Sequence, residues 1–253
     1  MTHLSRAFAF VVAALAAGVL HAAQVRVAVA ANMAAPLQKI ADDFERATGH
    51  EVVAALGSTG RFYAQLRGGA PFEVLLAADE EIPARLEREG LAMPGRRFTY
   101  AIGRLVLWSL DPGGVDPQGN VLKQLPRGRL AVADPRLAPY GAAAMQTLTR
   151  LGVLPAWERA LVQGESVGQA FQFVASGNAS YGFVALSQVM SEGRITRGSG
   201  WIVPAHYHAP LNQDVVLLNG GRANPAAHAF LAYLKSESAR TTLRSFGYDI
   251  ATP

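Results

Sequence analysis

Four short segments of this 253-residue chain place small polar side chains where a helix is expected to begin. The segments are AANM (30–33), GSTG (57–60), DPRLAPYG (134–141) and GESVGQ (164–169). Asn32, Ser58, Thr59 and Ser166 are residue types that cap helix N-termini. The first N–H groups of a helix have no acceptor inside it, so several such ends together can bind an anion without lysine or arginine. The predicted chemistry is therefore recognition of an anion by neutral donors.

Each loop, taken singly, has simpler explanations. A serine or asparagine at a helix start usually caps that helix and binds nothing else. GSTG lacks the lysine of the phosphate-binding pattern GxxxxGK[ST], and it does not fit the GxSxG turn of hydrolases. Histidines after residue 23 occur at 50, 206, 208 and 228, and none lies in the four loops. An exported α/β hydrolase stays an open alternative, but it would have no histidine base in these loops.

The elements that must position these loops alternate between strands and helices. Apolar runs predict strands at 25–30, 51–56, 73–77, 98–110, 129–133, 181–186 and 214–218. Helical periodicity predicts helices at 35–48, 61–67, 80–89, 141–151, 167–176, 224–236 and 237–246. This alternation is typical of parallel sheets covered by helices, in which ligands bind beyond the carboxyl ends of the strands. All four loops take that place.

The order of the elements predicts two lobes. Long extended segments near 98–106 and 201–210 could cross between two α/β units, and the C-terminal helices would then return to the first unit. We expect domain I to comprise 24–101 and 207–253, and domain II to comprise 102–206. The fold class is therefore α/β, with two parallel or mixed sheets, a hinge of two crossing segments and a ligand in the cleft between the lobes.

The N-terminus is expected to be an export signal. Arg6 precedes an apolar run from Ala7 to Leu20, and small residues follow at Ala22 and Ala23. This order is typical of a cleavable signal peptide (1–23), with cleavage after Ala22 or Ala23. The alternative, a membrane anchor, is disfavoured because the run of 14 apolar residues is short for a bilayer.

The composition of the mature chain excludes several classes of partner and covalent modification. The formal net charge is +4, and the basic residues are spread along the chain with no basic arm or aromatic platform, so we expect no nucleic-acid partner. The chain has no cysteine, which excludes a disulfide and a thiol-linked lipid. We expect an exported, soluble monomer.

Longer motifs around these loops carry a family resemblance over nearly the whole mature chain. They are AANMAAPLQKIADDFERATGHEV, GSTGRFYAQLRGGAPFEVLLAAD, PGRRFTYAIGRLVLWS, DPRLAPYGAAAMQTL and GNASYGFVALSQV. The chain resembles the periplasmic molybdate-binding proteins of ABC transporters. The resemblance implies a type II periplasmic binding protein, without enzymatic activity or cofactor, that delivers molybdate or tungstate to a membrane permease. Sulfate, phosphate or an organic anion stays open as the ligand of such a fold.

The resemblance also implies the ligand contacts. It assigns Asn32, with Ala31 before it, to the first loop and Thr59, with Ser58 beside it, to the second. It assigns Tyr140 and Val167, through their backbone N–H groups, to the third and fourth. Molybdenum or tungsten would thus be bound only as the oxyanion, through Asn32, Thr59, Tyr140 and Val167. Some members use a tyrosine where this chain has Ala185, so another donor must replace that phenol here; the Asn32 amide or the Tyr140 side chain could do so.

Overall fold

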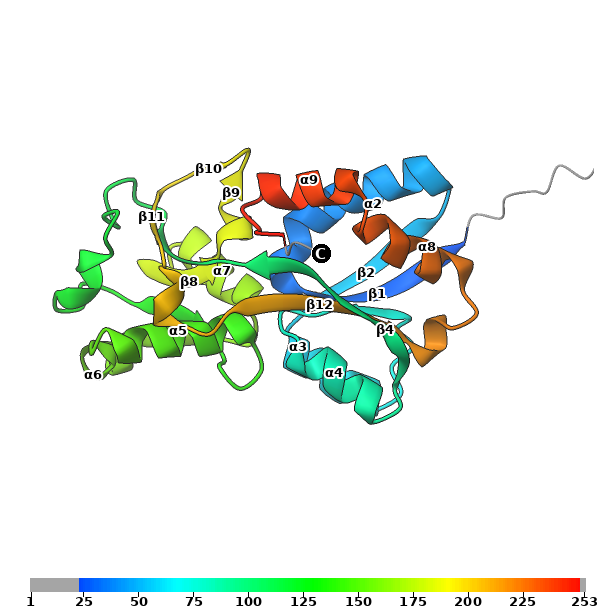
Figure 1. Cartoon of the computed structure of the whole chain (residues 1–253). Helices are drawn as coiled ribbons and strands as arrows, with labels where there is room; N and C mark the ends of the chain where they lie inside the picture. The colour runs from blue at the N-terminus through cyan, green and yellow to red at the C-terminus, as the bar shows by residue number, and fades with distance from the viewer. Residues whose placement is uncertain (1–22, 251–253) are drawn as a thin grey trace, which may run out of the picture.

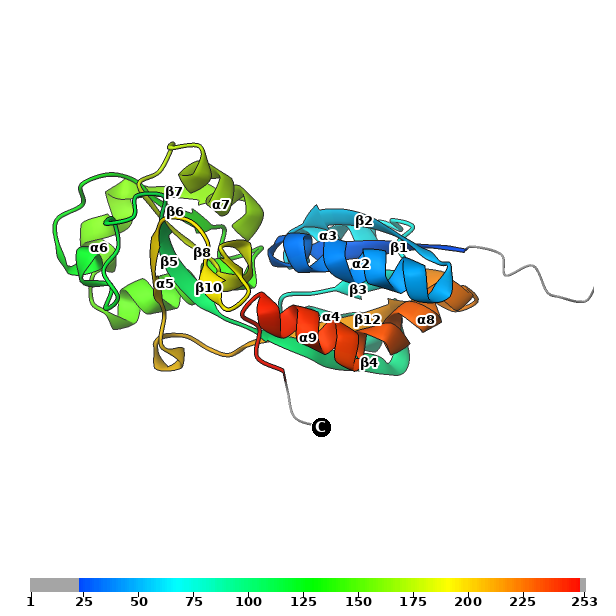
Figure 2. The same ribbon diagram turned by 90° about the horizontal axis from the view of Figure 1, so that it is seen from above.

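A computed structural model describes residues 23–250 and has two lobes side by side (Figures 1 and 2). Each lobe is built on a five-stranded mixed sheet. The α/β two-lobed fold class predicted from the sequence is confirmed. The predicted signal peptide (1–23), with cleavage after Ala22 or Ala23, lies outside the described residues except for Ala23, so it stays a prediction.

The sheet of the first lobe joins the start of the chain to its end. In spatial order its strands are β2 (Glu51–Gly57), β1 (Gln24–Ala30), β3 (Val74–Leu76), β12 (Leu211–Leu218) and β4 (Ala92–Gly103). Strands β1, β2 and β3 are parallel, whereas β12 runs antiparallel to both β3 and β4. The carboxyl ends of β1, β2 and β3 therefore lie at one edge of the sheet.

Helices cover both faces of this sheet because the side chains of a strand alternate between faces. The helices are α2 (Ala34–Thr48), α3 (Thr59–Arg67), α4 (Glu81–Arg88), α8 (Pro225–Leu234) and α9 (Glu237–Ser245). Val27 and Val215 pack on one face with α2, α8 and α9, while Ala28 and Val216 pack on the other with α3 and α4. The sheet thus lies between two layers of helices, with α2, α8 and α9 above it and α3 and α4 below it in Figure 1.

The second lobe has a similar plan. Its strands, in spatial order, are β11 (Ser199–Ile202), β5 (Leu105–Ser109), β8 (Tyr181–Ala185), β6 (Leu130–Ala133) and β7 (Leu161–Gly164). Its helices are α5 (Pro139–Arg150), α6 (Leu154–Trp157) and α7 (Val167–Ala175), and β9 (Met190–Ser191) pairs with β10 (Arg194–Ile195) in a small hairpin. Strands β6, β7 and β8 are parallel, so their carboxyl ends also share one edge.

Short 3-10 helices join these elements. They are η1 (Ala31–Met33), η2 (Asn120–Lys123), η3 (Glu158–Ala160), η4 (Leu186–Gln188), η5 (Ala205–Tyr207) and η6 (Asn219–Gly221). The segment 201–210, expected to be extended, contains η5 after β11. Strand β7 was not predicted, because LVQG is short and only half-buried. No helix among residues 23–250 is long and apolar enough to cross a membrane.

Two crossings connect the lobes. The first passes from β4 to β5 at Arg104, and the second passes from β11 through η5 to β12. Strands β4 and β12 pair over Leu211–Leu218, so both crossings enter the first lobe as neighbouring strands (Figure 1). The predicted domain limits at 101/102 and 206/207 fall within these crossing segments or beside them, and they stay a prediction.

Phe44 of helix α2 makes an aromatic contact with helix α8, and a substitution there tests the packing of the first lobe's core. It is fully buried and packs edge-on against Phe230, with ring centroids 5.4 Å apart. Phe44→Ala should lower the free energy of unfolding by about 3–5 kcal/mol, because it leaves a cavity in a closely packed core. Urea denaturation measures the change. As a control, Leu125→Ala at an 83 % exposed position should change it by less than about 0.5 kcal/mol. Equal effects of the two substitutions would contradict this account of the core.

Candidate functional site

The first lobe contributes two of the predicted loops. Ala30 and Gly57 are paired residues at the ends of β1 and β2, so η1 and the start of α3 lie side by side. Ser58 precedes α3 and is buried, but its Oγ has no hydrogen-bond partner among residues 23–250. Thr59 is fully buried, and its Oγ1 accepts a hydrogen bond from the Ala78 N–H at 3.0 Å. Both hydroxyls therefore keep a proton that could be donated to a ligand.

The second lobe contributes the other two loops. Ala133 and Gly164 pair at the ends of β6 and β7, which places the starts of α5 and α7 next to each other. Tyr140 and Val167 are buried in the first turns of these helices. Backbone N–H groups in a first turn have no acceptor within their helix. Ser166 acts as the N-cap of α7, because its Oγ accepts from the Gln169 N–H at 3.3 Å.

Contacts across the cleft bring the four loops together. The Gly60 N–H donates to the Leu137 carbonyl at 2.9 Å, which joins the second loop to the third. Arg61 forms an ion pair with Glu165 at the fourth loop. Ala31 packs so closely on Gly168 that a Cβ added there would lie 3.0 Å from the Ala31 Cβ. The lobes are thus closed on each other around the predicted loops.

Asn32 lies at the centre of a buried polar network. Its Nδ2 donates to Gln213 Oε1 and to the Tyr248 hydroxyl, both at 2.7 Å. Its backbone carbonyl accepts from the Ser187 hydroxyl of the second lobe at 2.8 Å. The Oδ1 atom is buried and has no partner among the described residues. The amide hydrogens that the sequence predicted to face an anion are therefore used inside the protein in this arrangement.

Tyr140 reaches the same network from the second lobe. Its hydroxyl accepts a hydrogen bond from Gln213 Nε2 at 3.0 Å. Gly103 on β4 lies directly beneath, where an added Cβ would be only 2.2 Å from the Tyr140 hydroxyl and 2.4 Å from Gln213 Nε2. The close approach at this point requires glycine.

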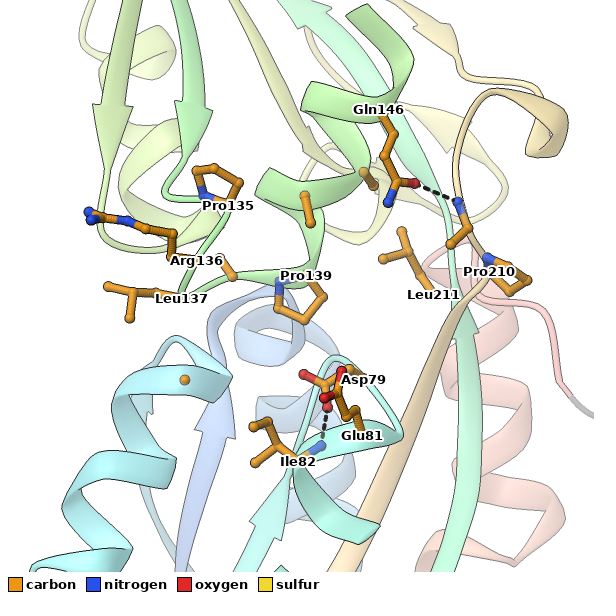
Figure 3. Close-up of a pocket in the computed structure, with 15 residues that line it drawn as sticks. Asp79, Glu81, Ile82, Pro135, Arg136, Leu137, Pro139, Gln146, Pro210 and Leu211 are labelled. Atoms are coloured by element: carbon orange, nitrogen blue, oxygen red, sulfur yellow. Dashed lines mark hydrogen bonds between the residues drawn. The ribbon is translucent and has the colours of Figure 1, made fainter. Parts of the chain in front are cut away.

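A cavity of about 390 Å³ lies between the two lobes (Figure 3), and its lining does not include Tyr140, Gln213 or Gly103. Pro139 and the chain before it form one wall, and Asp79, Glu81 and Ile82 form the opposite wall. Gln146 closes the side next to the crossing segment, where its Oε1 accepts from the Ala209 N–H at 2.8 Å. A second hollow, lined by Ser58, Arg61, Glu165 and Ser166 among others, opens where α3 faces α7.

The residues predicted to contact the anion are uncharged. The buried polar side chains of residues 23–250 include no lysine or arginine. Arg61 and Arg136 lie at the margin, are exposed, and are paired with Glu165 and Asp134. The same described residues contain no group of three or more His, Cys, Asp or Glu that could hold a metal ion. The arrangement suits an anion bound by hydrogen bonds from neutral groups.

Asp79 is a carboxyl group in the cavity wall whose pKa is altered by burial. Burial raises the pKa of its carboxyl from 3.8 to about 6, and the nearby Glu81 and Asp214 carboxylates add to the rise. The Ile82 N–H, which donates to Asp79 Oδ1 at 2.8 Å, opposes it. Asp79 precedes Glu80, the N-cap residue of α4, and its carboxyl combines a hydrogen bond from the first turn of that helix with a raised pKa.

Comparison with known proteins decides the family. The model of the family described as bacterial extracellular solute-binding protein matches residues 25–249. A molybdate-binding protein ModA of Azotobacter vinelandii is 53 % identical over 243 residues, which cover 94 % of this chain and 96 % of the relative. The chain belongs to the family of periplasmic molybdate-binding proteins. Members of this family are binding proteins, so the chain is not an enzyme, and no cofactor is indicated.

Two further members give the same result. A ModA of Rhodobacter capsulatus is 48 % identical over 227 residues and covers 90 % of this chain and 88 % of the relative. The solved structure of an Azotobacter vinelandii periplasmic molybdate-binding protein superposes with a TM-score of 0.86 at 42 % identity, over 90 % of this chain and all of that one. The family resemblance inferred from the motifs is therefore confirmed.

The structure adds residues that the motifs did not single out. Gln213, Tyr248, Tyr100 and Ser187 form the buried network around Asn32. The sequence signal that could have pointed to Gln213 and Asp214 is a run of three polar residues, starting at Asn212, in an otherwise apolar strand. Both are fully buried. Ala185, at the position where some family members have a tyrosine, is buried and donates its N–H to Gln188 Oε1.

The raised pKa of Asp79 predicts a pH-dependent stability. Between about pH 4 and pH 6 the folded protein holds a proton that the unfolded chain has released, so stability falls as pH rises through this interval. The loss, on the order of 1–3 kcal/mol, persists at neutral pH. Asp79→Asn keeps the oxygen that accepts from Ile82 and removes the charge. Its melting temperature should exceed that of the wild type at about pH 7.5 and equal it near pH 4. Melting curves that differ by the same amount at both pH values would contradict the assignment.

Proposed function

We propose that this chain captures molybdate between its two lobes in the periplasm and delivers it to the permease of an ABC transporter. Tungstate, the same size class of tetrahedral dianion, is expected to bind as well. The names of the relatives support the molybdate assignment. The observation in this chain that carries the proposal is the buried Ser58 hydroxyl, which has no partner within the described residues and lies where four loops converge.

The proposed contacts come from both lobes. The hydroxyls of Ser58 and Thr59 donate from the first lobe, together with Asn32 and the chain at Ala31. The backbone N–H groups of Tyr140 and Val167 donate from the second lobe. Such neutral donors stabilise a dianion by hydrogen bonds of about 1.5–3 kcal/mol each. Fixed donors also select by size, because a smaller oxyanion leaves some of them out of reach.

We further propose that the lobes 24–101 with 207–253 and 102–206 open and close about the two crossings. The contacts Gly60–Leu137 and Arg61–Glu165 join the lobes and must break to admit the ligand. Hinge closure around a ligand is the general behaviour of periplasmic binding proteins. The chain is proposed to act as a monomer.

The signal peptide is proposed to be removed after Ala22. The Ala23 N–H lies 3.2 Å from His50 Nδ1, and the Ala23 carbonyl accepts from the Glu51 N–H at 3.0 Å. These contacts extend the β1–β2 pairing by one residue. Cleavage after Ala23, the other expected position, would remove them, which is why the contacts favour Ala22.

An anion panel tests the function itself. Molybdate and tungstate should each raise the melting temperature of the wild-type protein, because a ligand at 100 times its Kd adds about 2.7 kcal/mol to folding stability. Sulfate and phosphate at the same concentrations should have little effect, since their smaller size leaves donors too distant. Differential scanning fluorimetry and calorimetry give both quantities. Equal shifts with sulfate would show that the cleft does not select by size.

Ser58→Ala tests the proposed contact. The substitution removes a hydroxyl without a partner in the protein, so the free energy of unfolding should change by less than about 0.5 kcal/mol. The affinity for molybdate should fall roughly ten- to a hundredfold, the loss of one hydrogen bond to a charged group.

The matched control is Ser236→Ala, at the start of helix α9. The Ser236 Oγ accepts from the Ala239 N–H at 3.2 Å, as a helix cap does. This substitution should lower stability by about 1 kcal/mol and leave the affinity unchanged. If Ser58→Ala also lowers stability and leaves the affinity for molybdate unchanged, then the GSTG segment only caps helix α3 and does not contact the ligand.

A further inference from the structure

Gln213 connects the two lobes through hydrogen bonds to residues of the proposed anion site. It is fully buried on β12, where the second crossing enters the first lobe. Its Oε1 accepts from Asn32 Nδ2 at 2.7 Å and from the Tyr100 hydroxyl at 3.1 Å, and its Nε2 donates to the Tyr140 hydroxyl at 3.0 Å. One amide therefore touches a proposed contact residue of each lobe.

The direction of these hydrogen bonds leaves the oxygen of the Asn32 amide free, and this end cannot donate to an anion. Both protons of Asn32 Nδ2 are used, by Gln213 and by Tyr248, and Oδ1 is buried without a partner among the described residues. The free end of the amide is an acceptor. A fully deprotonated oxyanion offers only acceptors, so the two would repel each other.

The same contacts can be made with every hydrogen bond reversed. If both amides turn by 180°, Gln213 Nε2 donates to Asn32 Oδ1 and Gln213 Oε1 accepts from the Tyr140 hydroxyl. Nδ2 of Asn32 then occupies the unpartnered position. The reversal is possible because a phenol both donates and accepts, and burial keeps these phenols protonated by raising the pKa of Tyr140 well above 10 and that of Tyr248 to about 12.

The neighbouring groups stay paired after the reversal. Tyr248 turns its proton to Asn32 Oδ1, and the Asn32 carbonyl keeps the Ser187 hydroxyl as its donor at 2.8 Å. The Tyr100 hydroxyl accepts from Gln213 and donates to the Ala77 carbonyl, from which it lies 3.2 Å away. The reversed network thus pairs all of its buried groups and leaves two N–H donors for the ligand.

We propose that Gln213 is the positioning residue that sets which end of the Asn32 amide faces the oxyanion, and that the two amides rotate together when a fully deprotonated oxyanion enters. The proposal rests on the proposed function, because it requires the anion to lie at Asn32. It makes Gln213 a determinant of specificity that touches no ligand. It also links the anion to the Tyr140 hydrogen bond between the lobes.

The decisive variant is Gln213→Glu. A carboxylate only accepts, so it holds Asn32 Nδ2 in the observed direction and cannot donate to the turned Oδ1. Its affinity for molybdate, measured by calorimetry, should fall by about a hundredfold or more. The matched control is Gln146→Glu, which makes the same chemical change in the cavity wall and keeps the oxygen that accepts from the Ala209 N–H. Its affinity should fall by less than about fivefold, the effect of an added charge near the cleft.

An uncharged variant separates the effect of hydrogen-bond direction at Asn32 from the effect of side-chain packing at Gln213. Gln213→Met removes both hydrogen-bonding ends, so Asn32 is opposed only by Tyr248 and can still turn. Its affinity should fall by roughly tenfold, less than that of Gln213→Glu. A loss in Gln213→Met as large as that in Gln213→Glu would contradict the proposal, since a purely structural role predicts it.

Nuclear magnetic resonance of the side-chain amides follows the rotation directly and needs no variant. Addition of molybdate to the wild type should shift the NH₂ signals of Asn32 and Gln213 together, and in Gln213→Glu the Asn32 signals should stay in place. Unchanged wild-type NH₂ signals on saturation with molybdate would overturn the proposal. So would a Gln213→Glu affinity equal to that of Gln146→Glu. Absence of molybdate binding by the wild type would instead refute the proposed function, and this inference with it.

Discussion

The cost of burying polar groups without partners governs the interface between the two lobes. Closing the cleft removes water from hydroxyl, amide and backbone N–H groups at the ends of six parallel strands, and each unpaired group then costs free energy. Nearly all the buried side-chain groups of residues 23–250 find a partner; Ser58 Oγ, Asn32 Oδ1 and one nitrogen of His208 do not. The first two lie in the loops that converge between the lobes. A ligand that accepts hydrogen bonds relieves the cost at the Ser58 hydroxyl, and in the proposed function this relief ties closure of the lobes to binding.

The strand pairing within the two sheets brings those groups together between the lobes. Parallel pairing brings the ends of β1 and β2 together in one lobe and the ends of β6 and β7 together in the other. The antiparallel pair β4–β12 then joins the lobes, and it carries Gly103 and Gln213 at its cleft end. Because Gly103 has no side chain, Tyr140 of the second lobe can approach Gln213 of the first. The two strands that join the lobes therefore also carry part of the hydrogen-bond network around the proposed binding site.

The absence of buried lysine or arginine among the described residues has a consequence for selectivity. A buried cation would attract any dianion, whereas neutral donors reward only an anion whose oxygens meet them at hydrogen-bonding distance. The direction of each donor then matters as much as its position. The Asn32 amide has one donating and one accepting end, so in the proposed site its direction, set by Gln213, distinguishes acceptor-only anions from protonated ones. The hydroxyls beside them adapt to either direction.

Sequence alone determined the fold class, the order of most strands and helices, the position of the four loops and the family. It could do so because apolar periodicity and helix-starting residues are local signals, and because long motifs such as GSTGRFYAQLRGGAPFEVLLAAD are specific. It missed β7, whose four residues LVQG carry little periodicity. It could not foresee that Thr59 would bond to Ala78, or that Gln213 would join Asn32 to Tyr140, since these partners lie 19 and up to 181 positions apart. Only the tertiary structure decided which ends of the buried amides are free, because hydrogen-bond direction depends on every neighbour at once and not on the residue's own type.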